Sequence, residues 1–159
     1  MPQVHFVRSR EEAGSTAFRK IWSAADDATS ILAAHLVSEA MLFRFIQTKT
    51  ANPEALDLAQ WTYSEILVLV QSLRKKSSKE EWLWKTLRSL NSVRNRLAHD
   101  IETQHLPERI EKMYKTADRH IDIHAPGADP KDRENNKLKY FLLILCGVVN
   151  QLQNLDAEI

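Results

Sequence analysis

Apolar residues recur at intervals of three and four along most of the chain, which is the spacing of one face of an amphipathic helix. The clearest example extends from residue 26 to about residue 48, with apolar residues at Ile31, Leu32, Leu36, Val37, Ala40, Leu42, Phe43 and Ile46. Asp26 or Thr29 is suited to cap this helix, because a short polar side chain accepts from the free N–H groups of a first turn. A shorter helix is predicted before it, beginning near Ser15.

Four more helices follow from the same pattern and its boundary signals. Asn52 followed by Pro53 predicts a helix that continues to about Leu73 and is apolar on all sides over residues 66–70. Ser78 and Glu81 match a capping box, which predicts a long helix that ends near residue 98. Further helices are predicted from residue 107 and over residues 133–155, with a loop at residues 125–132 between them.

These elements predict an all-α protein, an up-and-down bundle of four to five long helices joined by short loops. With 3 glycines and 5 prolines, the chain has little of the turn chemistry of a many-stranded sheet. Its length fits a single helical domain over residues 1–159, in which residues 1–14 form a loose lead-in.

The charge is balanced, with 22 lysines and arginines against 21 aspartates and glutamates. This composition disfavours a dedicated duplex-DNA-binding protein, because phosphate contacts usually require a basic domain, but it leaves room for a small basic RNA site. Basic residues are densest at Arg74, Lys75 and Lys76. We interpret them either as a solvated helix end or as an RNA-contacting surface.

The single cysteine, Cys146, excludes a disulfide within the chain and favours a reducing cytoplasm. The N-terminus has no apolar signal-peptide core, and the apolar stretch at residues 140–149 has about half the length of a membrane span. We therefore expect a soluble, cytoplasmic protein that does not associate with membranes.

Candidate chemistry is concentrated at residues 90–101 (LNSVRNRLAHDI), where four residues separate Arg94 from His99 and Asn95 lies between them. Arginine stays charged near neutral pH and histidine titrates there, so the pair suits phosphate chemistry, in which one group holds the anion and the other transfers a proton. The alternative is purely structural, because a helix C-terminus also stabilises cationic side chains. Both interpretations remain open from spacing alone.

Two other groups of polar residues bear on this site. Glu39 lies among apolar positions of the helix predicted over residues 26–48, where a carboxylate is costly unless it is paired. We expect it to pair with Arg94 or His99, either as a structural clamp or as a catalytic assistant. His120, Asp122 and His124 have metal-binding side chains, but the helix is ending there, and we predict no metal and no other cofactor.

The segment LNSVRNRLAHDI resembles the signature of HEPN-type helical domains, in which an arginine, a polar residue and a histidine recur with four to six residues between the arginine and the histidine. A second segment, residues 34–46 (AHLVSEAMLFRFI), is similar to an early helix of that family. The mannitol operon repressor-like proteins share this layout. The resemblance extends over residues 26–155, and these two segments are its specific part.

The resemblance implies a four- or five-helix bundle that forms a homodimer with two motifs facing each other. Where such domains are catalytic, they are metal-independent ribonucleases. Arg94 would then bind the scissile phosphate, His99 would act as general base or acid, and Asn95 would orient one of them.

Two functions are therefore expected. The first is an RNA-binding protein or RNA endonuclease of the HEPN type, acting as a toxin or defence effector. The alternative is a non-catalytic regulator or immunity protein that binds a protein partner, as the mannitol repressor-like proteins would. The intact motif favours the first function, and the near-neutral charge favours the second.

Overall fold

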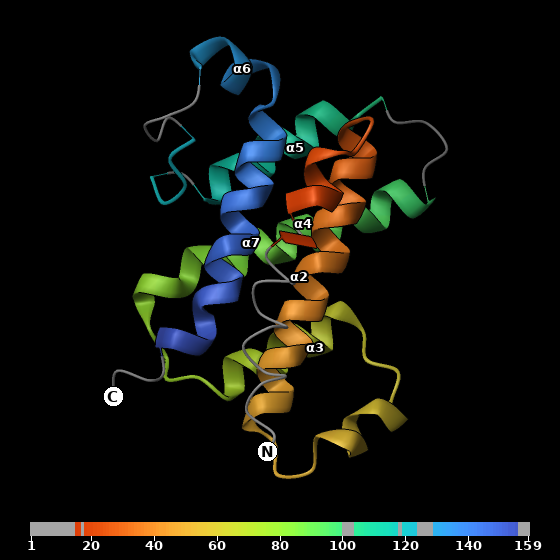
Figure 1. Ribbon diagram of the computed structural model, residues 1–159, viewed down its shortest axis with the longest axis vertical. Coiled ribbons are helices and arrows are strands. Elements are labelled where there is room, and N and C mark those ends of the chain that lie inside the picture. Colours follow the sequence, from red (N-terminus) through yellow and green to blue (C-terminus); the bar gives the residue numbers. More distant parts are fainter. Residues whose placement is uncertain (1–14, 17, 100–103, 118, 124–128, 156–159) are drawn as a thin grey trace.

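A computed structural model describes residues 15–16, 18–99, 104–117, 119–123 and 129–155 of the chain. Within these ranges the regular structure is entirely helical, which confirms the prediction of an all-α bundle (Figure 1). The α-helices are α2 (Asp27–Lys49), α3 (Tyr63–Ser72), α4 (Glu81–His99), α5 (Leu106–Thr116), α6 (Pro130–Asn135) and α7 (Lys137–Leu155). Two short 3-10 helices, η1 (Pro53–Leu58) and η2 (Ser78–Glu80), precede α3 and α4.

Helices α2 and α7 lie side by side along the long axis of the molecule and run in the same direction (Figure 1). Near the start of both, the Lys139 Nζ donates to the carbonyl oxygen of Trp22 at 2.9 Å. Further along both, the Cys146 Sγ lies 3.9 Å from the carbonyl oxygen of Ala34. The central pair of the bundle is therefore parallel, which the hydrophobic pattern did not indicate.

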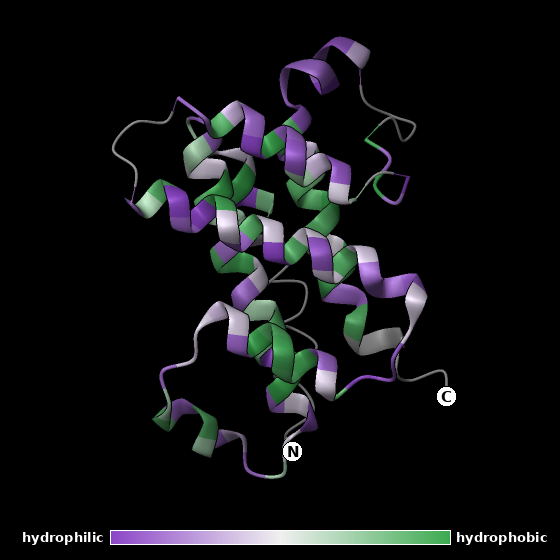
Figure 2. Ribbon diagram, turned by 180° about the vertical axis from the view of Figure 1, so that it is seen from behind, coloured by the Kyte–Doolittle hydropathy of each residue, from purple (hydrophilic) through white to green (hydrophobic). Residues whose placement is uncertain are grey.

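The core fills the space between α2, α7 and the helices that cross behind them. Hydrophobic residues gather on the inward side of the long helices and polar residues on the outward side (Figure 2). The largest fully buried side chains come from all the long helices and include Ile31, Leu42, Phe45, Leu83, Leu87, Leu90, Met113, Leu142, Leu145 and Leu152. Helix α4 therefore lies with one side in the core and the other free for a site.

Among the described residues, α2 is the one helix long and apolar enough to cross a membrane by length and composition. In its most apolar 18-residue window, 56% of the residues are buried inside the protein. Its N-terminus is capped by Asp26, whose carboxylate accepts from the N–H of Thr29 at 2.7 Å. This degree of burial is that of a core helix. A core helix can be as long and as apolar as a membrane-spanning helix, so it meets the same two criteria.

The helix predicted from Asn52 to Leu73 is in fact two elements, so this prediction was wrong in its boundaries. Asn52 makes no side-chain cap, and the chain leaves η1 at Leu58 before α3 begins at Tyr63. A capping box that we had not predicted starts α3: the Thr62 hydroxyl accepts from the Glu65 N–H, and the Glu65 carboxylate accepts from the Thr62 N–H. The stronger start signal therefore lies ten residues beyond the one we used.

Three further expectations on element boundaries and burial are corrected. The C-terminal helix is interrupted at Asn136, whose side chain donates to the carbonyl oxygen of Asp132 and so competes with regular helical bonding. The cap before α4 is Ser77 and belongs to η2, where we expected Ser78. Residues 66–70 are not buried on all sides, because Val68 is 64% exposed.

Candidate functional site on helix α4

The buried stripe of α4 determines which of its residues face solvent. Leu83, Leu87 and Leu90 are fully buried, and Val93 continues the same stripe. Because a helix turns about 100° per residue, Ser92, Asn95, Arg96 and His99 lie on the side opposite this stripe. Near the C-terminus of α4 this leaves Asn95, Arg96 and His99 exposed and Arg94 half-buried at the edge.

Asn95 and His99 line a groove of about 470 Å³ between the C-terminal half of α4 and the start of α3. The other residues that line it are Ser64, Arg88, Asn91, Ser92 and Arg96. The structure therefore brings together two of the three residues expected from the motif. It adds two arginines that we had not predicted, although Arg96 precedes His99 by three residues and so lies on the same helical face.

Arg94 does not line this groove. Its Nη1 donates to the Asn95 Oδ1 at 3.1 Å, so Arg94 contacts the site through the side-chain amide of Asn95. That bond directs the carbonyl end of the Asn95 amide toward Arg94 and leaves the donor end, Nδ2, for the groove. Arg94 thus positions Asn95, and the cations in the groove itself are Arg88 and Arg96.

A buried histidine lies directly beneath the groove. His35 of α2 is 5% exposed, and its ring stacks on that of Tyr63 with 4.2 Å between centroids. Its Nε2 lies 3.0 Å from the Asn91 Oδ1, and an amide oxygen only accepts, so Nε2 carries the proton. The buried Nδ1 has no hydrogen-bond partner among the described residues.

Burial is the main reason that the pKa of His35 is lower than its usual value of 6.5, and the nearby charge of Arg94 lowers it further. The hydrogen bond to Asn91 and the carboxylate of Glu39 act in the opposite direction. His35 is therefore neutral near pH 7. No pattern in the sequence linked this buried residue to the site.

Asn91 connects His35 to the groove surface. Its Oδ1 is held by His35, and its Nδ2 donates to the Ser64 Oγ at 3.3 Å. With both ends of the amide engaged, Asn91 has a fixed orientation in the groove floor. Asn91 and Asn95 are four residues apart, so the sequence could have placed both on one helical face. The contact between Asn91 and His35 could not be found in this way, because the two residues are 56 positions apart.

Glu39 is half-buried, and among the described side chains no hydrogen bond or ion pair joins it to Arg94 or His99. The expected pairing is therefore not formed. Partial exposure lets water solvate the carboxylate, which removes the need for a protein partner. Its charge still reaches the buried pair, because it raises the pKa of His35 and of Tyr63.

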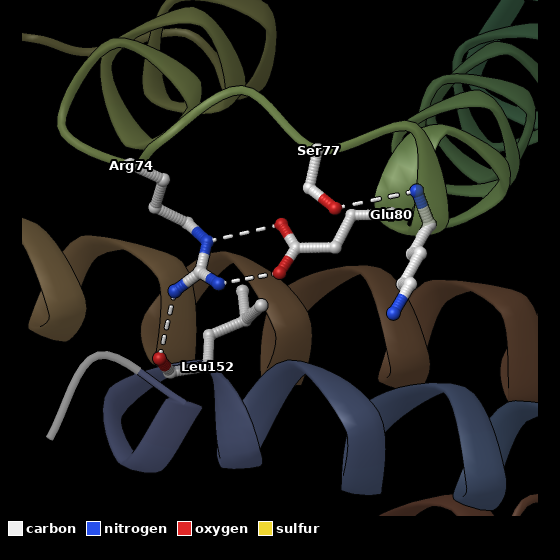
Figure 3. Close-up of polar contacts among 5 residues, drawn as sticks. Arg74, Ser77, Glu80 and Leu152 are labelled. Atoms are coloured by element: carbon white, nitrogen blue, oxygen red, sulfur yellow. Dashed lines mark hydrogen bonds and ion pairs between the residues drawn. The ribbon is translucent and has the colours of Figure 1, made fainter. Parts of the chain in front are cut away.

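Arg74, expected as an RNA contact, is instead part of the protein framework (Figure 3). Its guanidinium donates through Nε and Nη2 to the two carboxylate oxygens of Glu80 and through Nη1 to the carbonyl oxygen of Leu152. The Arg74 side chain is 6% exposed. It joins the segment after α3 to the start of α4 and the end of α7, and this burial keeps it from a ligand.

Lys75 and Lys76, the other two expected RNA contacts, are exposed and line a second groove of about 640 Å³ between α3 and the N-terminal half of α4. Lys85 and Arg88 of α4 line it as well. Arg88 also donates through Nη2 to the Gln71 Oε1 at 2.7 Å, which holds the arginine against α3. The two grooves therefore share Arg88.

The weaker metal alternative has no support among the described residues. No group of His, Cys, Asp and Glu side chains in that part of the chain could hold a metal ion. The ring of His120 lies flat against Trp82, with 4.8 Å between centroids and 3° between planes. His124 lies outside the described residues.

Comparison of the chain with protein-family models, with curated proteins and with solved structures gave no match.

Proposed function

We propose that the chain is a cytoplasmic RNA-binding protein of the HEPN type that cleaves RNA without a metal ion. The observation that carries this proposal is that His99 and Asn95 share one groove with Arg88 and Arg96. An imidazole beside two permanent cations is suited to a phosphodiester, because the cations hold the anion where the imidazole can exchange a proton.

The reaction would use the RNA's own 2′-hydroxyl as nucleophile. His99 accepts the hydroxyl proton as the oxygen attacks phosphorus, the bond to the 5′-oxygen breaks, and a 2′,3′-cyclic phosphate and a 5′-hydroxyl end result. Arg88 and Arg96 stabilise the charge that develops on the phosphoryl oxygens, and the Asn95 Nδ2, positioned by Arg94, donates to the same group. In this scheme Arg94 is a positioning residue.

The leaving 5′-oxygen needs a proton from the side opposite the base, and one groove contains one histidine. We propose that a second copy of the chain supplies the second histidine in a homodimer with facing grooves. Sedimentation equilibrium at micromolar concentration then gives twice the chain mass of 18.4 kDa. A monomer at every concentration that supports cleavage would contradict the dimer.

The cleavage test compares wild type, His99→Ala and His105→Ala on an end-labelled structured RNA with a chelator present. His105 is a matched control, because its side chain is 73% exposed at the start of α5 and lines neither groove. We expect His99→Ala to lose about 100-fold or more in rate and His105→Ala to retain wild-type activity. His99 is exposed, so circular dichroism should show a folded variant. Equal cleavage by both variants would contradict the role of His99.

A second function is supported by exposed apolar side chains outside the grooves. Leu36 of α2 is 57% exposed, and Leu58 at the end of η1 is 90% exposed. Large exposed apolar groups suit a surface for a protein partner, as expected for a non-catalytic regulator or immunity protein. Absence of RNA cleavage and RNA binding by the wild-type protein would favour this function.

A further inference from the structure

The two grooves beside α4 share Arg88 and lie along the same face of the helix, and we call them together the furrow. Its α4 residues recur at intervals of three and four, in some turns as an adjacent pair, which places them on one face of the helix: Glu81, Trp84, Lys85, Arg88, Asn91, Ser92, Asn95, Arg96 and His99. Helix α3 forms the opposite wall, since Ser64 contacts Asn91 and Gln71 contacts Arg88. At about 1.5 Å per residue, the distance from Lys85 to His99 is roughly 21 Å.

Positive charge is concentrated in this furrow. The residues that line the two grooves include six lysines and arginines and two glutamates, an excess of four positive charges, whereas the whole chain has a formal charge of +1. The remaining residues therefore have a net charge of −3. Such segregation attracts a polyanion to one face of a nearly neutral protein.

Both glutamates of the furrow are already paired. Glu80 binds Arg74, and Glu81 lies 2.8 Å from the Lys85 Nζ. Among the described residues, the basic side chains of the furrow that form no ion pair are Lys75, Lys76, Arg88 and Arg96. They mark both ends and the middle of the furrow, so its cations are available along its length.

We propose that this furrow binds a single strand of RNA, which extends from Lys75 and Lys76, past Arg88, to His99. The inference rests on the proposed function and adds to it the form of the substrate and its path. A single row of cations matches the single row of phosphates of one strand. The hydroxyls between the cations, such as that of Ser92, reach base edges that are exposed only in an unpaired strand.

Binding is tested by fluorescence anisotropy with labelled oligouridylates of about 4 and about 16 nucleotides, a range that covers common single-strand site sizes. His99→Ala protein is used throughout, so that cleavage does not shorten the probe. We expect a Lys75→Ala/Lys76→Ala double substitution to weaken binding of the longer RNA about 10-fold at low salt and to leave the shorter RNA nearly unaffected. The slope of log affinity against log salt should fall in magnitude by about 1.4, for two lost contacts to a single strand.

Two further substitutions test the path of the RNA along the furrow. Arg88→Gln should weaken binding of both oligonucleotides, because Arg88 lies in both grooves. A Lys112→Ala/Lys115→Ala double substitution on α5 is the matched control, since both lysines are exposed and line neither groove. It should leave binding unchanged.

The outcomes separate this inference from the proposed function. Binding of the longer RNA that resists the Lys75/Lys76 and Arg88 substitutions, or equal affinity for a duplex of the same length, would overturn the path even if His99 is needed for cleavage. Furrow-dependent binding without cleavage by wild type would support the path and contradict the nuclease. Absence of any RNA binding would overturn both and favour a protein partner.

Discussion

At the scale of single residues, His35 makes stability depend on pH. Its pKa in the folded protein is below the usual 6.5, so between these two values the unfolded chain binds a proton that the folded protein does not. The free energy of unfolding should therefore fall as the pH drops below 6.5, by at most about 1.4 kcal/mol per pH unit. Urea unfolding from about pH 8 to about pH 5 measures this slope.

His35→Gln is the informative variant, because its amide can still donate to Asn91 but does not titrate in this range. It should reduce the slope relative to wild type, whereas His105→Ala, at an exposed position, should not. An unchanged slope in His35→Gln would mean that another group causes the pH dependence.

The motif predicted that Arg94, Asn95 and His99 lie together, but only Asn95 and His99 line the groove. Spacing placed Asn95 and His99 together, because two residues four apart lie on the same face of a helix. Arg94 took a different role, since the position of the buried stripe turns its side chain toward Asn95 and away from the groove. The support from His35 and the burial of Arg74 depend on contacts between distant segments, which no local pattern contains.

At the scale of elements, Thr62 fixes the start of α3. We therefore predict that the two helix-start signals, Thr62 and Asn52, contribute unequally to the stability of the protein. Thr62→Ala removes the hydroxyl that accepts from the Glu65 N–H and should cost about 1 kcal/mol of stability. Asn52→Ala should cost much less, because Asn52 makes no side-chain cap. Urea unfolding of the two variants checks the difference, and an equal loss in both would contradict our assignment of the cap.

Helix existence was predictable here and helix ends were less so. Apolar spacing persists across the corner between η1 and α3, so periodicity alone joined them into one helix. The corner is held by a side-chain contact that apolar spacing does not describe, the Trp61 Nε1 donating to the carbonyl oxygen of Leu56 at 2.9 Å. Similarly, Asn136 interrupts the last helix through its bond to Asp132, within a pattern that otherwise reads as continuous.

At the scale of the whole molecule, the helix content and the buried faces followed from the sequence, but the relative direction of the helices did not. The amphipathic pattern of α2 requires an apolar neighbour without specifying which helix or which direction. The parallel contact of α2 with α7 joins segments more than a hundred residues apart. The separation of charge into the furrow is likewise visible only once α3 and α4 are packed together.

The parallel pair also contains the chain's only thiol, and this gives the protein an internal reporter. Cys146 is 1% exposed against α2, and burial raises its pKa to about 12. The thiolate is the reactive form, so iodoacetamide should modify the folded protein only when α2 and α7 separate. Arg74→Ala leaves Glu80 unpaired and frees the end of α7, so alkylation should accelerate by roughly 5-fold or more, as expected for a loss of at least 1 kcal/mol.

Lys85→Ala is the control for this experiment, because its ion pair with Glu81 is exposed and should contribute less than about 1 kcal/mol. Alkylation of the native protein at the rate of the urea-denatured chain would contradict a closed helix pair. Otherwise, the alkylation rate of one atom measures how often two helices from opposite ends of the described chain come apart. RNA bound in the furrow would slow that rate if strand binding and opening of the bundle are coupled.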